Sequence, residues 1–445
     1  DGGAPAVQHR EGMVEGGARW TVDMPADWNG VLVTFGNPRP ETNKALLQLG
    51  YAVGNFMQRP GIGLRPRQWA DDQLASLRDI RAQLTPKAVV TVGYSGPGLV
   101  NTMIAEDKGG LVQGAVIGCA LNVGLRNLFN VHLDGQHALS VLLLPKTHRP
   151  KLVGFGSEVE IDTSVAMLRA AVMRAQRTPE GRARIALAAG LGMMPSWFDP
   201  ASPPPADDDY DAQEIAQFNH YSALSTMGFE GSVVEGGAHR PEKGWPGVTV
   251  GGNLSFMDYS RWDIERLAGG NISSNAGVDY ARLFGGLPNR KQVEALYAKA
   301  GLDLAADLKR LSEEADIKAA PAALDWAAKN ASVTGALRIP ALTIRPISDI
   351  AGPQYDTWYA GRVKEAGASD KLRQVHLQEL GHCRFTPAEE IAAVTTVRAR
   401  IETGNWGDSA SPEALQKLAE SLNLGPAKFI AYKPGKFLSD RERQP

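Results

Sequence analysis

Hydrophobic residues follow two regular spacings along the first 120 residues of the chain. Short apolar runs rich in β-branched residues are typical of buried strands, and longer stretches with apolar residues three and four positions apart are typical of helices. Because strands separated by helices pair in parallel, this order predicts a doubly wound, mostly parallel α/β sheet. The predicted strands cover residues 19–24, 31–35, 51–57, 88–93 and 112–119, and the predicted helices cover residues 43–48 and 70–84.

The alternation stops after residue 120 and resumes at residue 339. The segment between them is mainly helical in pattern and includes a proline-rich, acidic tract at 202–211. We expect this insertion to form a cap over the carboxyl edge of the sheet, where open α/β sheets bind their ligands. After it, the pattern predicts strands at 339–345 and 372–378 and helices at 355–365, 387–401 and 412–422.

These changes of pattern divide the chain into four parts. Residues 1–120 and 338–405 are expected to form the two halves of one α/β domain, and residues 121–337 its helical cap. Residues 406–445 have glycine and proline after one helical pattern, so we expect a tail that packs on the core.

Composition excludes several classes of protein. Hydrophobic residues at 43% and charged residues at 22% do not fit a disordered or fibrous chain. A net charge of -2 with dispersed basic residues disfavours nucleic-acid binding. The longest apolar stretches are shorter than the roughly 18 residues of a membrane span, so none is expected.

The chain starts with Asp-Gly-Gly-Ala-Pro, without methionine. Such a start is typical of a mature chain that has lost a signal peptide, and it predicts a secreted or periplasmic protein. Two cysteines are too few for a disulfide scaffold but compatible with one bridge in an oxidising compartment.

The Gly-Tyr-Ser-Gly segment at 93–96 joins a predicted strand directly to a helical pattern. A sharp strand-to-helix turn presents a serine hydroxyl at the top of a sheet, and small residues flank it because a Cβ would collide there. The strict motif has glycine two positions after the serine, where this chain has Pro97 followed by Gly98. Proline is tolerated in the first turn of a helix. We interpret the segment as a nucleophile elbow with Ser95 as the nucleophile; an ordinary loop serine is the alternative.

A serine nucleophile needs a base within hydrogen-bond reach and a third group that orients the base. His382 lies in the loop after the last predicted strand, and Asp349 lies in the loop after the strand at 339–345. This gives the chain order Ser, Asp, His, although a turn-forming aspartate is the alternative for Asp349. His376 is expected to pack or face solvent. Surface or polar-core positions are expected for the histidines of the insertion, His132, His137, His148, His220 and His239.

These residues resemble the α/β-hydrolase superfamily. The chain is most similar to secreted bacterial members whose last histidine lies in a Gly-His-Cys-x-Phe-Thr-Pro-Ala-Glu motif, found here at 381–389. The resemblance extends into the insertion through Gly-Asn-Ile-Ser-Ser-Asn at 270–275 and Val-Asp-Tyr-Ala-Arg at 278–282.

The resemblance implies that Ser95, Asp349 and His382 are nucleophile, acid and base. It also implies that the oxyanion hole consists of the backbone amides of Gly96 and Asn37. Relatives often carry His-Gly before the second donor, whereas this chain carries Phe-Gly at 35–36.

Cys119 and Cys383 are expected to form a disulfide. Cys119 ends the strand after the elbow helix, roughly 5 Å from the elbow strand, and the loop that carries His382 must reach Ser95 over the same region. A bridge would clamp that loop to the sheet, and two free buried thiols are the alternative. Tannases and feruloyl esterases, which the chain partly resembles, instead bond a cysteine after the histidine to one directly before the serine, where this chain has Tyr94.

No metal or cofactor is expected. The glycines at 61–63 lack the third glycine of a dinucleotide site, no phosphate-binding loop or HExxH motif occurs, and the aspartates at 207–209 suit a solvated loop. Cap-core positions, or else positions lining a pocket, are expected for Trp197, Phe198, Phe218, Tyr221, Phe229 and Trp326.

The sequence thus predicts a serine-dependent hydrolase that cleaves a small carboxylic ester through an acyl-enzyme. Two alternatives stay open. The same triad could serve an acyltransferase or a short-peptide peptidase, or the chain could be a binding protein without catalysis on this fold.

Overall fold

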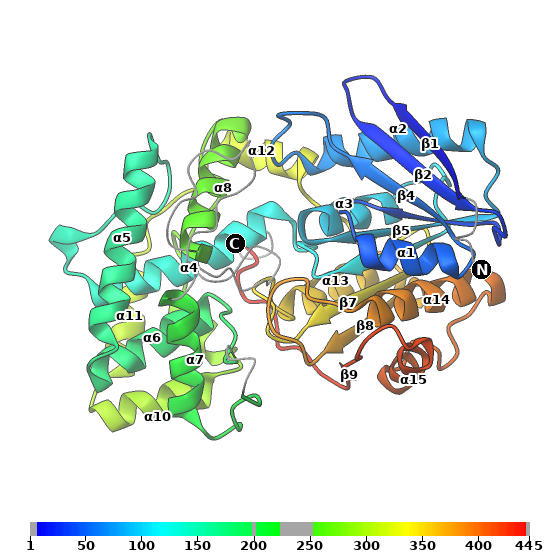
Figure 1. Cartoon of the computed structure of the whole chain (residues 1–445). Helices are drawn as coiled ribbons and strands as arrows, with labels where there is room; N and C mark the ends of the chain where they lie inside the picture. Colours follow the sequence, from blue (N-terminus) through cyan, green and yellow to red (C-terminus); the bar gives the residue numbers. More distant parts are fainter. Residues whose placement is uncertain (1–6, 198–201, 223–251, 442–445) are drawn as a thin grey trace.

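One sheet of nine strands runs through the described part of the chain, residues 7–197, 202–222 and 252–441 of a computed structural model (Figure 1). The strand order is β1-β2-β4-β3-β5-β6-β7-β8-β9. Neighbours from β4 to β8 in that order are parallel, and β1, β2 and β9 complete the edges in antiparallel pairs. The strands are β1 (Val7–Met13), β2 (Arg19–Pro25), β3 (Val31–Phe35), β4 (Ala52–Met57), β5 (Ala88–Tyr94), β6 (Gly114–Gly118), β7 (Ala341–Pro346), β8 (Leu372–Leu377) and β9 (Phe429–Ile430).

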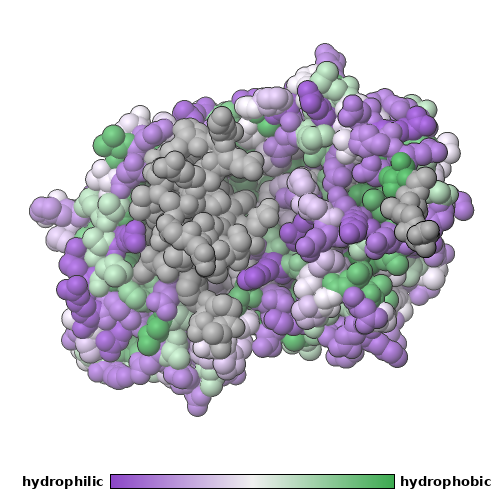
Figure 2. Space-filling model, in the orientation of Figure 1, coloured by the Kyte–Doolittle hydropathy of each residue, from purple (hydrophilic) through white to green (hydrophobic). Residues whose placement is uncertain are grey.

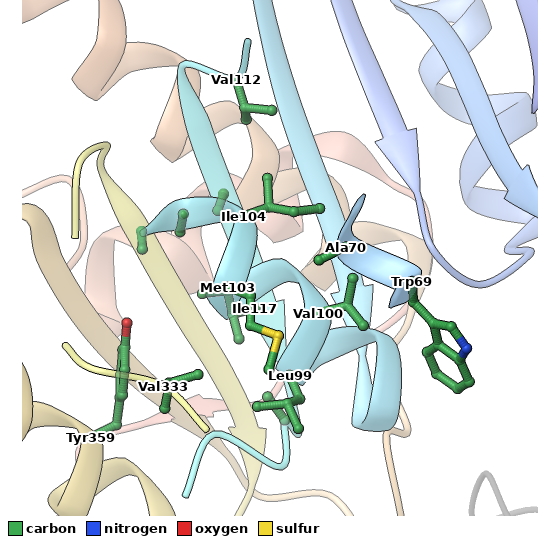
Figure 3. Packing of buried hydrophobic residues seen from close by; sticks show 14 of the residues in the cluster. Trp69, Ala70, Leu99, Val100, Met103, Ile104, Val112, Ile117, Val333 and Tyr359 are labelled. Carbon is green, nitrogen blue, oxygen red and sulfur yellow. The ribbon is translucent and has the colours of Figure 1, made fainter. Parts of the chain in front are cut away.

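Successive residues of the central strands point to opposite faces, and each face has its own apolar cluster. Val89 and Ile117 pack with α2, α3 and α13, and Figure 3 shows part of this first cluster. Val90 and Val116 pack with α1, α14 and α15 in a second cluster. The strands are continuous apolar runs because both faces of the sheet are buried. These helices are α1 (Pro40–Gln48), α2 (Pro66–Gln83), α3 (Ser95–Ala105), α13 (Gln354–Glu365), α14 (Pro387–Thr403) and α15 (Pro412–Leu422); a short 3-10 turn, η2 (Ser369–Lys371), precedes β8.

The helices between β6 and β7 form a lobe beside the sheet, called here the helical lobe (Figure 1). The lobe has its own apolar cluster, into which α4 extends with Leu139 and Leu142 after starting in the first sheet cluster with Leu125 and Phe129. The predicted fold class, an α/β sheet with a large, mainly helical insertion, is therefore confirmed. The lobe contains α4 (Gly124–Leu143), η1 (Lys146–His148), α5 (Glu158–Ala175), α6 (Pro179–Leu191), α7 (Tyr210–Ser222), α8 (Gly252–Ala268), α9 (Tyr280–Gly285), α10 (Arg290–Ala300), α11 (Leu304–Glu313) and α12 (Pro321–Asn330).

Two strands are absent from the sequence prediction. The residues of β1 are exposed at almost every position, so no apolar alternation marks the strand, and β9 has only two residues. The tail after β9 also reaches further than expected, because it continues from the sheet to the helical lobe. There Ser439 Oγ donates to Asp134 Oδ2 over 2.6 Å, and the Arg441 guanidinium pairs with the same carboxylate.

The aromatic residues of the insertion separate into different settings. Phe218 and Tyr221 pack in the cluster of the helical lobe, and Trp326 packs against the first sheet cluster. Trp197 donates from Nε1 to a backbone carbonyl five residues later over 2.9 Å. Phe198 and Phe229 lie outside the described residues.

Hydrophilic residues dominate much of the described surface in Figure 2, and hydrophobic ones form small separate groups. Large exposed hydrophobic side chains are spread over different elements, such as Met13 on β1 and Val159 on α5. Among the described helices, none is both long enough and apolar enough to cross a membrane.

Candidate active site

Ser95 lies at the sharp turn between β5 and α3. Its φ of 60° is in the left-handed region, and its side chain is buried, with 5% of the residue exposed. A Cβ on Gly93 would lie 2.5 Å from the Pro97 carbonyl oxygen, and one on Gly98 would lie 2.7 Å from the Ala120 Cβ. Gly98 thus lets α3 pack closely against the end of β6. In the strict motif the glycine stands one position earlier, where this chain has Pro97.

The structure brings Ser95, His382 and Asp349 into one chain of hydrogen bonds. The distance from Ser95 Oγ to His382 Nε2 is 2.7 Å, and that from His382 Nδ1 to Asp349 Oδ1 is 2.6 Å. Asp349 also accepts from two backbone amides, that of Ala351 over 2.7 Å and that of Cys383 over 2.9 Å. All three side chains are buried; the first residue of α3 and the loops after β7 and β8 supply one each.

The turn after β3 lies against the elbow. The Gly36 amide donates to the Val92 carbonyl over 3.0 Å, which extends the β3–β5 ladder by one residue. The Asn37 side chain then accepts from the Tyr94 amide over 3.0 Å and donates to the Tyr94 carbonyl over 3.4 Å. Gly96 is in the first turn of α3, where amides have no acceptor within the helix. The two predicted oxyanion donors therefore belong to segments that are bonded to each other.

Cys119 and Cys383 form the predicted disulfide, with their Cα atoms 5.3 Å apart. The bridge is buried, and the Cys383 sulfur lies 3.4 Å from His382 Nε2. It connects the end of β6 with the residue that follows His382, so it holds the histidine loop against the sheet. Ligand atoms of both cysteines, Asp349 and His382 lie within 4.8 Å of one another, but sulfurs in a disulfide offer no thiolate to a metal.

Arg345 lies beneath the loop that carries Asp349, and the sequence analysis did not identify it. Its buried guanidinium bonds both oxygens of Asp356 at 3.0 Å and also donates to the carbonyls of Ala351 and Ala120. Burial acts to raise the pKa of Asp356, but Arg345 and then His376 outweigh it and hold the pKa at about 2. The signal in the sequence was a charged residue at the end of a buried apolar strand.

The other histidines have structural partners where they are described. His376, expected to pack or face solvent, is buried and lies 3.1 Å from Asp356 Oδ2. His137 bonds the Leu311 carbonyl at 2.9 Å, and burial lowers its pKa. His239 and the side chain of His220 lie outside the described residues.

Comparison with known proteins gives one full-length relative. No family model matches the chain. An o-phthalyl amidase from Xanthobacter agilis is 29% identical over 474 aligned positions, which cover 96% of each chain.

Solved structures to which this chain is similar include enzymes of several activities. They include feruloyl esterase B from Aspergillus oryzae, with 11% identity, coverage of 88% of this chain and 80% of that chain, and a TM-score of 0.38. Another is the epoxide hydrolase VrEH1 from Vigna radiata, with 12% identity, coverage of 89% and 98%, and a TM-score of 0.34. The strand order and the strand-turn-helix at Ser95 are those of an α/β-hydrolase fold with a helical insertion.

Proposed function

We propose that this protein is a serine hydrolase that cleaves a small carboxylic acid derivative through an acyl-enzyme. The observation that carries the proposal is the continuous chain from Ser95 through His382 to Asp349, with distances of 2.7 and 2.6 Å. In this arrangement a histidine can take the serine proton while a carboxylate holds its ring in the required tautomer.

Each group has a defined task in the proposed reaction. Ser95 Oγ attacks the acyl carbon, and its proton passes to His382 Nε2. The amides of Gly96 and Asn37 hold the negative oxygen of the tetrahedral intermediate, which is where preorganised donors contribute most. His382 then gives the proton to the leaving group, and a water activated by the same nitrogen releases the acyl group from Ser95.

Asp349 orients the base in this proposed cycle. Its two oxygens accept from His382 and from two backbone amides, so three donors hold the carboxylate in place. It therefore stabilises the imidazolium without taking its proton.

Esters are the substrates predicted from the sequence, and amides are a second candidate. The relative from Xanthobacter agilis, aligned over nearly its whole length, is named an amidase. Both bonds can be cleaved by the same steps, but an amide nitrogen must be protonated as it leaves, so cleavage depends more strongly on His382 as an acid. Acyl transfer to another acceptor, short-peptide cleavage and binding without catalysis are the remaining alternatives.

A location outside the cytoplasm also belongs to this proposal. The buried disulfide joins two segments of the site and is the kind of bridge that persists in oxidising compartments. Enzyme isolated from the native host, denatured, and alkylated before and after reduction should show no free thiol until it is reduced.

The test combines labelling with turnover. A fluorophosphonate should attach to Ser95, as located by peptide mass spectrometry, and aryl esters and matched aryl amides should be hydrolysed. Ser95→Ala should lower kcat by roughly 10⁴ to 10⁶ and abolish labelling while the folded structure is kept. Ser421→Ala, an exposed serine on α15, is the control.

The outcomes distinguish the alternatives. Retention of a tenth of the activity in Ser95→Ala would rule out the proposed nucleophile. An unlabelled wild-type protein without turnover would favour a binding protein. Faster product formation with added alcohols or amines than with water alone, and a corresponding acylated product, would favour an acyltransferase.

A further inference from the structure

Arg39 lies at the junction of three segments of the candidate site. It is the residue before α1 and follows Asn37 by two positions in the turn after β3. Its side chain does not extend into solvent, since only 17% of it is exposed. Instead it runs across the elbow toward the histidine loop.

The guanidinium of Arg39 contacts the elbow, the histidine loop and the start of α14. Nε donates to Glu390 Oε1 over 2.6 Å, and Nη2 donates to the Cys383 carbonyl over 3.1 Å. Its central carbon lies 4.6 Å from the centre of the Tyr94 ring. Burial raises the pKa of Tyr94 well above its ordinary value, so the ring beneath the cation stays neutral.

Two of these partners are direct chain neighbours of the reacting residues, and the third is on the helix that follows the histidine loop. Tyr94 precedes Ser95, Cys383 follows His382, and Glu390 lies in the first turn of α14, just beyond the histidine loop. One planar side chain thus joins the turn of the oxyanion donor, the elbow and the base. We propose, resting on the proposed function, that Arg39 is a positioning residue that fixes these three segments relative to one another.

Cys383 is held in place by three contacts, one of which comes from Arg39. Its sulfur is bonded to Cys119, its amide donates to Asp349, and its carbonyl accepts from Arg39. Cys383 has a φ of 55°, a left-handed conformation that non-glycine residues adopt only when their surroundings impose it. Of these three contacts of Cys383, the hydrogen bond from Arg39 is the one that connects it to the turn after β3, which carries the predicted oxyanion donor Asn37.

The chemistry of arginine suits this role. A guanidinium presents donors in fixed directions in one plane, whereas a lysine ammonium is a single point of charge. Glu390 is only 2% exposed, and Thr42 Oγ1 donates to its other oxygen. Glu390 is thus held by Thr42 of α1 and binds Nε of the arginine, while Nη2 donates to the histidine loop.

The test separates positioning from a merely structural ion pair. For Arg39→Lys, Arg39→Met and the charge-free double variant Arg39→Met/Glu390→Leu, kcat and KM for 4-nitrophenyl acetate, the rate of fluorophosphonate labelling and the midpoint of thermal unfolding would be measured. Arg184→Met is the matched control. Its guanidinium pairs with a mostly buried Asp307 at 2.7 Å in the helical lobe, with 27% of the arginine side chain exposed.

We expect Arg39→Met to lower kcat and the labelling rate by roughly 10- to 100-fold while KM changes less than about threefold, because a small displacement of base or oxyanion donor slows the chemical step. The double variant should keep this defect although its buried charge has been removed. Arg39→Lys should recover part of the loss. Arg184→Met should lose stability with kcat unchanged.

Two results would overturn the inference. One is a folded double variant with wild-type kcat and labelling rate, and the other is an Arg39→Met variant that loses stability only, as the Arg184→Met control does. If Arg39→Met fails to fold, the double variant decides. If wild-type protein neither labels at Ser95 nor turns over, the proposed function fails and the inference falls with it, a result distinct from active wild type with unaffected Arg39 variants.

Discussion

The sheet and the helical lobe both pack around apolar clusters and both bury charged groups, but those groups join different parts of the chain. Around the sheet, apolar residues of each central strand pack against helices on both faces, and the polar residues of the site are on the loops at one edge. In the helical lobe, charged and hydroxyl groups are themselves buried between elements far apart in sequence. Asp134 of α4 bonds Tyr280 of α9 and both Ser439 and Arg441 of the tail.

This difference assigns separate tasks to the two regions. The loops of the sheet bring the reacting groups together, so changes there should alter turnover with little loss of stability. The buried polar groups of the lobe maintain its packing and its attachment to the tail, so changes there should alter stability first. The following experiments test that division, in order of decreasing effect.

Asp349→Asn should have the largest effect and should act on turnover. Asp349 accepts from His382 and from two backbone amides through two oxygens. The carboxamide of asparagine keeps only one acceptor oxygen and has an NH2 donor in place of the other. We expect kcat to fall by roughly three to four orders of magnitude, measured with aryl esters, because the histidine is held in the wrong tautomer. Asp370→Asn, at an exposed side chain, is the control. A loss below tenfold would place the acid elsewhere.

Asp134→Ala should mainly affect stability. The Arg441 side chain is 5% exposed and would lose its carboxylate, and the hydroxyls of Tyr280 and Ser439 would lose an acceptor. Removing one partner of a buried ion pair typically costs about 3–5 kcal/mol. Urea unfolding should show this loss, while kcat of the folded enzyme stays within about threefold.

Asp208→Ala, at an exposed loop residue of the same lobe, serves as its control. If Asp134→Ala instead abolished turnover at unchanged stability, the division between the two regions would be wrong.

Replacing both cysteines with serine should affect stability and turnover together. The bridge closes a loop over a sequence separation of 264 residues, which contains the whole helical lobe, and its sulfur contacts His382. Loss of a disulfide typically costs about 2–4 kcal/mol. Unfolding midpoints and kcat would be compared with those of wild type incubated with a reductant. Unchanged values for both would mean that Arg39 and Asp349 hold Cys383 without the bridge.

Glu214→Gln should have the smallest effect, visible as a change in pH dependence. Glu214 on α7 is buried beside Gln176, and burial raises its pKa to about 7 from an ordinary 4.5. The folded state therefore binds this proton more tightly than the unfolded state. Its contribution is fully present below pH 4.5 and is lost as the pH rises through 7.

The Gln variant cannot titrate at this position, so its stability should fall less than that of wild type between pH 5 and pH 8, by on the order of 2 kcal/mol. Urea unfolding at the two pH values measures the difference. Glu413→Gln, exposed on α15, should follow the wild-type pH dependence. Parallel curves for Glu214→Gln and wild type would contradict the raised pKa.

Much of the sheet and of the candidate site could be predicted because the information is local. The central strands are buried on both faces, so their apolar runs mark them within one or two residues of the observed ends. Ser95 follows directly on such a strand, and Asp349 and His382 lie in the loops after two others. Since parallel strands end at the same edge of a sheet, their order along the chain was enough to bring these residues together.

The supporting contacts could not be predicted in this way. Arg39 and Glu390 are 351 positions apart, and neither stands in a motif of its own. In the sequence, Arg345 is only a charged residue near the end of a predicted strand, with no sign of its partner. The strand β1 is exposed at almost every position, so no apolar pattern marks it. The contact of the tail with Asp134 depends on how the helical lobe packs beside the sheet, which no local pattern in the sequence indicates.

The sequence by itself determined the α/β sheet and the strand-turn-helix at Ser95, because periodicity, turn chemistry and strand order are written along the chain. It made the pairing of the two cysteines an expectation, with free thiols as the alternative, and the structure decided for the bridge. Only the tertiary structure decided which buried charges meet, as Arg39 meets Glu390, Arg345 meets Asp356 and Arg441 meets Asp134. The physical reason is that a charge is stable in the interior only beside a partner. That partner can come from any element that packing brings near.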